Sequence, residues 1–175
     1  MRIRTNMFVT LDGKVSGPDG RPVQLLMPGF TGADSYGLPE FLATCEAVVM
    51  GRTTFLPALG APQWPWKQPV FVLTSTALPE GTPSDVTSAP TAAELVELMQ
   101  AAGITGDVHL VGGPMTIQAF REIGALAEMW LHIVPMIVAD GLPLAPPGAE
   151  PLALTLQSTR TFPDGVLELG YSLEP

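Results

Sequence analysis

Residue types that bind phosphate gather at three points of the 175-residue sequence, each where an apolar run gives way to a helical pattern. These junctions are residues 50–54, 73–76 and 111–116. Glycines such as Gly51, Gly112 and Gly113 let a backbone approach a ligand closely, and a helix start offers free N–H groups with a partial positive charge. Ligands of open α/β sheets bind beyond the carboxyl ends of the strands, where all three junctions are expected. The pattern predicts a site that grips a pyrophosphate from two sides.

The first two junctions together indicate which nucleotide that site would take. Arg52 is the only full positive charge at the three junctions, and Ser75 and Thr76 add hydroxyl groups. An NAD-specific ribose site usually presents a carboxylate, and none stands at residues 74–76. A 2′-phosphorylated cofactor, NADPH, therefore fits better than NADH. The competing interpretation is a set of plain glycine turns beside a solvated arginine, but the joint appearance at three successive junctions favours a site.

The sequence lacks the motifs of other common nucleotide, hydrolase and metal sites. The motifs G-x-G-x-x-G, G-x-x-x-x-G-K-[ST] and G-x-S-x-G are absent from the sequence. His109 and His132 lie within apolar runs, and with Cys45 they show no metal-ligand spacing, so we expect no metal site. Both histidines are predicted to be core or edge residues, and Cys45 is predicted to pack rather than to act as a nucleophile.

Composition limits the partners. The net charge is −9, and the eight basic residues are scattered, so a nucleic acid would be repelled. No apolar run reaches the ~18 residues that a membrane span requires, and we expect no membrane association. A single cysteine allows no internal disulfide and suits a reducing compartment, so a cytoplasmic location is expected.

The elements that must position these residues alternate along the chain. The expected strands are residues 2–10, 46–50, 69–74, 108–111 and 129–138, followed by a hairpin that turns at 163–165. The expected helices cover 34–44, follow Gly51, run from a Thr91–Glu94 capping box to Gly103, and follow Pro114. This order predicts one α/β domain over residues 1–175, with three layers, a mostly parallel sheet covered on both faces, and an antiparallel C-terminal edge hairpin.

Four segments, in order along the chain, resemble a known superfamily. Residues 8–15, F-V-T-L-D-G-K-V, resemble the S-L-D-G-K-I opening of the riboflavin-pathway reductase domain. Residues 48–55, V-V-M-G-R-T-T-F, are similar to a V-x-M-G-R-x-T-F/Y segment that this domain shares with dihydrofolate reductase. Residues 111–113 match the glycine pair of both, and residues 128–135 are similar to an E-L-x-L-x-I-x-P strand. The chain is identified as a member of the dihydrofolate-reductase-like superfamily, nearest the reductase domain of the bacterial riboflavin-biosynthesis deaminase–reductase.

The resemblance implies an NADPH-dependent hydride transfer to a small molecule, a pterin-like or phosphoribosylamino-pyrimidine substrate. It implies that Arg52 contacts the adenosine 2′-phosphate, that the starts of two helices hold the pyrophosphate, and that the turn after the first strand borders the nicotinamide. The cofactor residues so implied are Thr10, Val15, Gly51, Arg52, Thr53, Thr54, Thr74, Ser75, Thr76, Gly112, Gly113, Pro114, Met115 and Thr116.

Hydride transfer must be followed by protonation of the substrate, and a carboxyl group is the expected proton donor. Dihydrofolate reductases carry one on the first helix, and Asp34 has about that spacing before Gly51. Asp12 and Glu40 are the alternatives. Two other functions stay open: a reductase of another heterocycle or carbonyl, and a nucleotide-binding module without catalysis. The apolar C-terminal region, together with the resemblance, predicts a homodimer.

Overall fold

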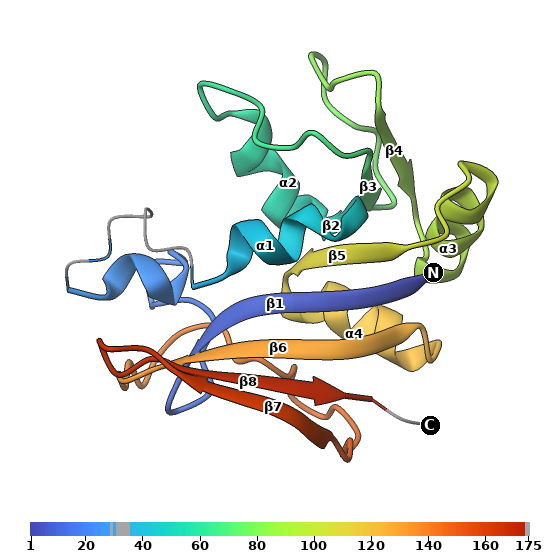
Figure 1. Ribbon diagram of the computed structural model, residues 1–175. Helices are drawn as coiled ribbons and strands as arrows, with labels where there is room; N and C mark the ends of the chain where they lie inside the picture. The colour runs from blue at the N-terminus through green and yellow to red at the C-terminus, as the bar shows by residue number, and fades with distance from the viewer. Residues whose placement is uncertain (29, 31–35, 174–175) are drawn as a thin grey trace.

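Eight strands form one twisted sheet in the computed structural model, which describes residues 1–28, 30 and 36–173 (Figure 1). The strands are β1 (Arg2–Thr10), β2 (Cys45–Gly51), β3 (Val70–Leu73), β4 (Val86–Ala89), β5 (Asp107–Gly112), β6 (Leu126–Val134), β7 (Thr155–Thr161) and β8 (Leu167–Ser172). Their order across the sheet is β4-β3-β2-β5-β1-β6-β8-β7. The first six in that order run parallel, and β8 and β7 are antiparallel to their neighbours.

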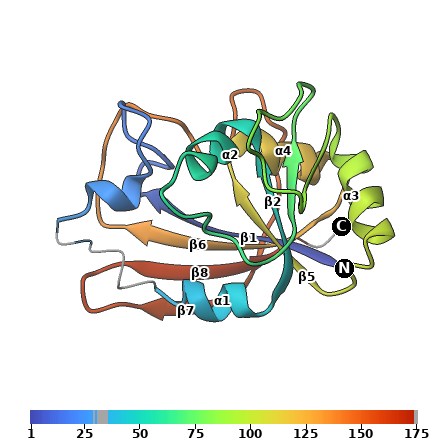
Figure 2. The ribbon, with the colours of Figure 1, turned by 90° about the horizontal axis from the view of Figure 1, so that it is seen from above.

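Helices lie on both faces of this sheet. They are α1 (Leu38–Ala43), α2 (Arg52–Leu59), α3 (Ala92–Ala101) and α4 (Pro114–Glu122), with a short 3-10 helix, η1, at Val23–Leu26. α2 packs on one face of β2 and β3, whereas α3 and α4 pack on the opposite face. Figure 2 shows α1 and α4 on opposite sides of the central strands. The predicted fold class, an α/β sheet with an antiparallel C-terminal hairpin, is confirmed.

The alternation of side chains along β1 explains which residues meet which layer. Ile3 and Val9 point into the core shared with α3 and α4. Arg4 and Asn6 point to the face that carries α1, where both are buried. In β2 the whole run from Ala47 to Met50 is inaccessible to solvent, as expected for a strand that is covered on both faces.

Several predicted elements differ from the structure at their ends. The strand predicted over 129–138 is β6 and ends at Val134, because Pro135 has no N–H to continue the ladder. The helix predicted over 34–44 is seen as Leu38–Ala43, and residues 31–35 lie outside the described part. β4 was not predicted, since its sequence V-T-S-A is short and half polar. The expected cover on both faces fails at β7, whose residues are all exposed.

Other local predictions are confirmed. The Thr91 hydroxyl caps α3 by accepting from the Glu94 N–H at 3.2 Å, and it donates to the Glu94 carboxylate at 2.9 Å. The C-terminal hairpin turns at Gly165, which has a φ of +89°. Cys45 is buried, and its thiol donates to the Phe41 carbonyl at 3.3 Å. None of the helices in residues 1–28 and 36–173 is long and apolar enough to cross a membrane.

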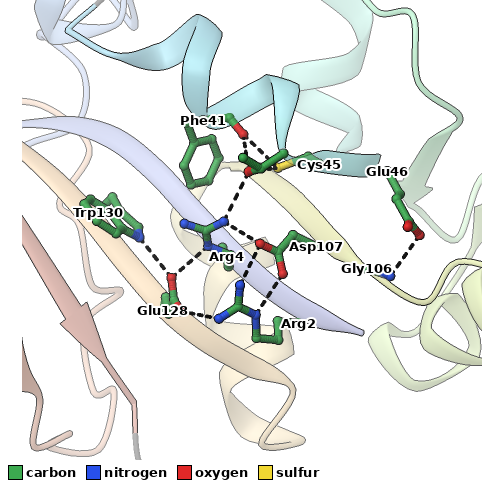
Figure 3. A network of polar contacts seen from close by, with 10 residues as sticks. Arg2, Arg4, Phe41, Cys45, Glu46, Gly106, Asp107, Glu128 and Trp130 are labelled. Carbon is green, nitrogen blue, oxygen red and sulfur yellow. Dashed lines mark hydrogen bonds and ion pairs between the residues drawn. The ribbon is translucent and has the colours of Figure 1, made fainter.

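A cluster of charges, drawn in Figure 3, joins the amino-terminal halves of the three central strands. The Arg4 guanidinium on β1 donates to Asp107 on β5 at 2.6 Å and to Glu128 on β6 at 2.7 Å. It also stands over the Phe41 ring of α1, 4.7 Å from the centroid. The Arg4 side chain is only 11% exposed, so this ion pair is shielded from water. The more exposed Arg2 bonds the same two carboxylates.

Both histidines lie inside, as predicted, and His109 is the more isolated of the two. Its ring on β5 makes edge contacts with Phe41 and Trp66, and neither ring nitrogen has a hydrogen-bond partner among the described residues. Burial lowers the pKa of His109 to about 4 from the usual 6.5. The folded protein therefore holds this imidazole neutral at pH values where the unfolded chain would protonate it.

This difference predicts a pH-dependent stability. As the pH falls, the unfolded chain takes up the proton before the folded protein does. The free energy of unfolding is therefore highest above pH 6.5 and decreases as the pH falls toward 4. Between pH 7 and pH 5 the loss should amount to about 2 kcal/mol of unfolding free energy. His109→Phe should remove most of this loss. Urea unfolding of both proteins at the two pH values measures it, and parallel pH profiles would contradict the prediction.

Candidate functional site

Two helix starts meet at the carboxyl ends of β2 and β5. α2 begins directly after Gly51, α4 begins directly after Gly113, and Met50 of β2 pairs with Gly112 of β5. A methyl group on Gly51 would lie 2.4 Å from the Thr116 hydroxyl in the first turn of α4. Only glycine allows this approach, so the sequence brings the positive ends of two helix dipoles together. An anion such as a pyrophosphate suits this position.

The backbone beside α4 leaves space on its open side. A methyl group built on Gly113 would meet nothing within 4 Å, and the φ of this residue, −88°, is one that any amino acid adopts. Gly112 has a φ of +132°, which favours glycine, and the peptide bond between the two glycines is cis. Neither the backbone conformation nor the packing inside the protein therefore requires a glycine at position 113. A ligand that approaches the backbone would account for it.

Arg52 and the turn after β3 lie next to each other, as the sequence suggested. The Arg52 guanidinium donates to the Ala77 carbonyl at 2.9 Å, immediately after residues 74–76. Thr74 and Thr76 share a hydrogen bond of 3.1 Å between their hydroxyl oxygens, and both Ser75 and Thr76 are exposed. One cation and a row of hydroxyl groups thus stand beside the start of α2, where a phosphate monoester could be bound.

The remaining residues predicted at the two helix starts fall into two groups. Thr53 is exposed and Thr54 is half-buried, so both lie in the first turn of α2 where a ligand could contact them. Pro114 and Thr116 are buried in the first turn of α4, whereas Met115 between them is exposed. The accessible groups at α4 are therefore its backbone and Met115.

Thr10 and Val15, predicted beside the nicotinamide, shape the turn after β1. Thr10 is buried, and its hydroxyl donates to Asp12 at 2.6 Å and accepts from the Lys14 N–H at 2.9 Å. The Val15 N–H donates to the Leu142 carbonyl at 2.8 Å. These bonds commit the polar groups of the turn to the protein itself. The turn could therefore contact a ligand through its shape rather than through hydrogen bonds of these groups.

Asp12, one of the two predicted catalytic carboxyls, is tied into this turn. It accepts from the Thr10 hydroxyl and from the backbone N–H groups of Ala139 and Val138, at 2.8 and 3.3 Å. The Thr10 hydrogen bond, helped by the two backbone groups, lowers the pKa of Asp12 despite the cost of desolvation. A carboxylate held in this way joins two loops and stays ionised, which favours a positioning role over proton donation. Asp34, the other candidate, lies outside the described residues.

Comparison of the sequence with protein-family models identifies the family of this chain. The family model of the RibD C-terminal domain matches residues 2–167. The chain belongs to this family. A sequence relative, the uncharacterized protein YyaP of Bacillus subtilis, is 26% identical over 97% of this chain and 94% of its own length.

Solved structures agree on the fold. A candidate riboflavin biosynthesis protein from a Shewanella species is similar over the whole of both chains, with a TM-score of 0.85 and 23% identity. The Thermotoga maritima deaminase/5-amino-6-(5-phosphoribosylamino)uracil reductase is matched over 99% of this chain and 56% of its own, with a TM-score of 0.74 and 15% identity. Schistosoma mansoni dihydrofolate reductase is matched over 99% of both chains, at a TM-score of 0.63 and 18% identity. The fold is thus dihydrofolate-reductase-like.

Sequence reasoning missed an aromatic cluster on the α1 face of β1. Phe8 stacks on His132 with ring centroids 4.9 Å apart, and Tyr36 contacts both rings. Phe162 packs edge-on against Tyr36 at 4.9 Å. These side chains come from β1, the segment before α1, β6 and the hairpin, so no local pattern joins them. The position of a histidine inside a predicted strand was the one available signal.

No group of three or more metal-ligating side chains is found within residues 1–28, 30 and 36–173.

Proposed function

We propose that the protein is an NADPH-dependent reductase that transfers hydride to a small heterocycle, pterin-like or a phosphoribosylamino-pyrimidine. The observation that carries the proposal is the meeting of two helix starts at Gly51 and Gly113, with Arg52 at its side. The family, and the uracil reductase of Thermotoga maritima that shares the fold, support the substrate class. The single, buried cysteine supports a cytoplasmic location.

The residues present fit the cofactor. The free N–H groups at the starts of α2 and α4 would hold the pyrophosphate, with Thr53 and Thr54 beside them. Arg52 would pair with the 2′-phosphate, and Ser75 and Thr76 would donate to it. When bound, NADPH supplies the hydride, and the turn that Asp12 anchors would position the ring it comes from.

A nucleotide-binding module without turnover is the second candidate. The aromatic cluster of Phe8, Tyr36, His132 and Phe162 favours it, because these rings fill space on the same face of β1 as Thr10. A screen of NADPH oxidation against dihydrofolate, phosphoribosylamino-pyrimidines and simple carbonyls separates the two. Turnover with any of them supports the reductase.

Replacing Arg52 tests the cofactor preference. Arg52→Ala should weaken NADPH binding about ten- to a hundredfold, because it removes a charge-assisted contact worth roughly 1.5–3 kcal/mol, while NADH binding barely changes. Calorimetric titrations with both cofactors measure the effect. Lys67→Ala removes an exposed cation from the loop before β3 and is the matched control. Equal losses for NADPH and NADH would remove Arg52 from the 2′-phosphate site.

Replacing Gly113 tests the pyrophosphate site. Gly113→Ala introduces a methyl group that meets no protein atom within 4 Å, so folding and thermal stability should be unchanged. The same methyl group would occupy the space through which the pyrophosphate reaches the backbone, and NADPH affinity should fall at least tenfold. A variant with normal affinity would show that the junction is only a turn.

The proton donor stays a prediction at Asp34. Asp34→Asn should lower turnover ~10²-fold or more with NADPH binding intact, and the loss should shrink at low pH, where solvent can supply the proton. Steady-state kinetics across pH, once a substrate is known, provide the measurement. Near-normal turnover would leave protonation to another acid or to water.

We also infer a homodimer formed through the C-terminal hairpin. Every residue of β7 is exposed, and Leu156 and Leu167 on the hairpin are 52% and 41% exposed. Light scattering at micromolar concentration should give twice the 18.5 kDa chain mass. Leu156→Lys should return it to 18.5 kDa, whereas Leu98→Lys, at an exposed leucine of α3, should not. A monomeric wild-type protein would exclude the dimer.

A further inference from the structure

A cavity of about 300 Å³ lies between α4, β6 and the segment 144–154 that follows β6. The residues of α4 that line it are Pro114, Ile117, Gln118 and Arg121, whose spacing of three and four residues places them on one face of the helix. The volume lies at the lower end of the range for small-molecule sites. Of the lining residues that the structure describes, only Pro114 is also assigned to the cofactor, so this cavity is separate from the Arg52 side of the cofactor site.

The inner walls of the cavity are apolar. Met129 and Leu131 alternate along β6 and therefore point to the same side of the sheet, where they are buried together with Ile117 of α4. The outer wall carries Leu152 and Leu154, which line the cavity although they are 39% and 37% exposed. The cavity thus opens to solvent beside two leucines. A hydrocarbon chain that entered here would remove apolar surface from water on both walls.

The outer wall is too stiff to fill the cavity itself. Residues 143–151 contain four prolines, and each proline fixes its own φ. The wall is also fastened at two points: the Leu144 N–H donates to the Gly13 carbonyl at 2.8 Å, and the Arg121 guanidinium donates to the Glu150 carbonyl. A wall held in this way cannot collapse onto β6. Since an empty apolar cavity costs stability, an apolar occupant would stabilise the protein.

Arg121 brings a positive charge to the edge of this apolar space. Its guanidinium donates to the Gln118 side-chain oxygen at 3.1 Å and to the Glu150 carbonyl, and both acceptors are uncharged. No carboxylate of residues 1–28, 30 and 36–173 forms an ion pair with it, and some of its N–H groups have no partner there. The last turn of α4 favours a cation at this position but does not neutralise it.

The charge and the apolar walls together define the occupant. A purely apolar molecule would take water away from the Arg121 guanidinium without replacing its hydrogen bonds, which is costly. A carboxylate attached to an alkyl chain would supply acceptors to the guanidinium while its chain fills the cavity. Glu150 also lines the cavity, but it is exposed, so solvent and salt screen its repulsion of an anion.

We propose that this cavity binds a fatty acid with a short alkyl chain. The chain lies among Ile117, Met129 and Leu131, and the carboxylate accepts hydrogen bonds from Arg121 at the edge. The site requires no cofactor and lies on the α4 face of the sheet, so it goes beyond the proposed function.

The test uses the whole protein without NADPH and three probes: octanoate, hexanoate and octanol. Methyl NMR spectra should show the Ile117 and Leu131 signals shifting on addition of octanoate, and calorimetry gives the affinities. Octanoate should bind roughly fifteenfold more tightly than hexanoate, because two further methylene groups are buried. Octanol has the same chain without the charge and should bind about tenfold more weakly than octanoate.

Replacing Arg121 separates the head group from the chain. Arg121→Gln should weaken octanoate binding about tenfold and leave octanol binding within about twofold, because only the carboxylate needs the guanidinium. Lys67→Gln, at an exposed cation outside the cavity, is the matched control and should change neither affinity. Equal losses for octanoate and octanol would show that Arg121 only holds the segment 144–154 in place.

Replacing Leu152 tests the chain site without touching the core. Leu152→Glu should weaken octanoate binding at least tenfold, whereas Leu98→Glu, at a leucine of α3 with similar exposure, should have no effect. This pair keeps the test decisive if Arg121→Gln does not fold. Methyl signals that ignore millimolar octanoate would overturn the proposal. Octanoate binding to Leu156→Lys but not to the wild type would also overturn it and would assign the cavity to a second copy of the chain. Failure of the Arg52 prediction would not affect the result, since no cofactor is present.

Discussion

The ion pairs of Arg4 are the interaction on which the arrangement of the central strands depends. A guanidinium in the middle of the sheet must be paired, and its partners Asp107 and Glu128 lie on the two strands that flank β1. Separating the shielded Arg4 guanidinium from either carboxylate costs free energy, because the guanidinium then lacks one of its two ion-pair partners. Any register that separates Arg4 from either carboxylate incurs this cost. The pairing therefore discriminates against alternative alignments of β5, β1 and β6.

The carboxyl ends of the central strands carry the candidate cofactor site. The alignment of these ends follows from the register that the Arg4 ion pairs favour. Once β1, β5 and β2 are aligned, Gly112 lies beside Met50, and the starts of α2 and α4 come into contact through Gly51 and Thr116. The candidate anion site consists mainly of backbone, so a chain of net charge −9 could hold an anionic cofactor there. Arg52 supplies a side-chain cation there.

One face of β1 serves three environments in succession. Arg4 pairs with the carboxylates of both neighbouring strands, Asn6 is buried on the face that carries α1, and Phe8 begins the aromatic cluster that lies before Thr10. The alternation of a strand places all four side chains on one side, while the odd-numbered residues fill the core with α3 and α4. A single strand thereby links the Arg4 charge cluster, the aromatic cluster and the turn beside the candidate cofactor site.

Local pattern was enough to determine much of this protein. Apolar runs predicted the buried strands, and a few neighbouring residues were enough to predict the Thr91 cap and the Gly165 turn. Glycines at strand ends indicated the candidate anion site. Each depends on neighbours along the chain. The tertiary structure alone decided that Asp12 anchors a loop through Ala139, that Phe8 stacks on His132, and that Asn6 is buried on the face that carries α1. These contacts join residues far apart in sequence, and their energies depend on burial and direction, which no local periodicity encodes.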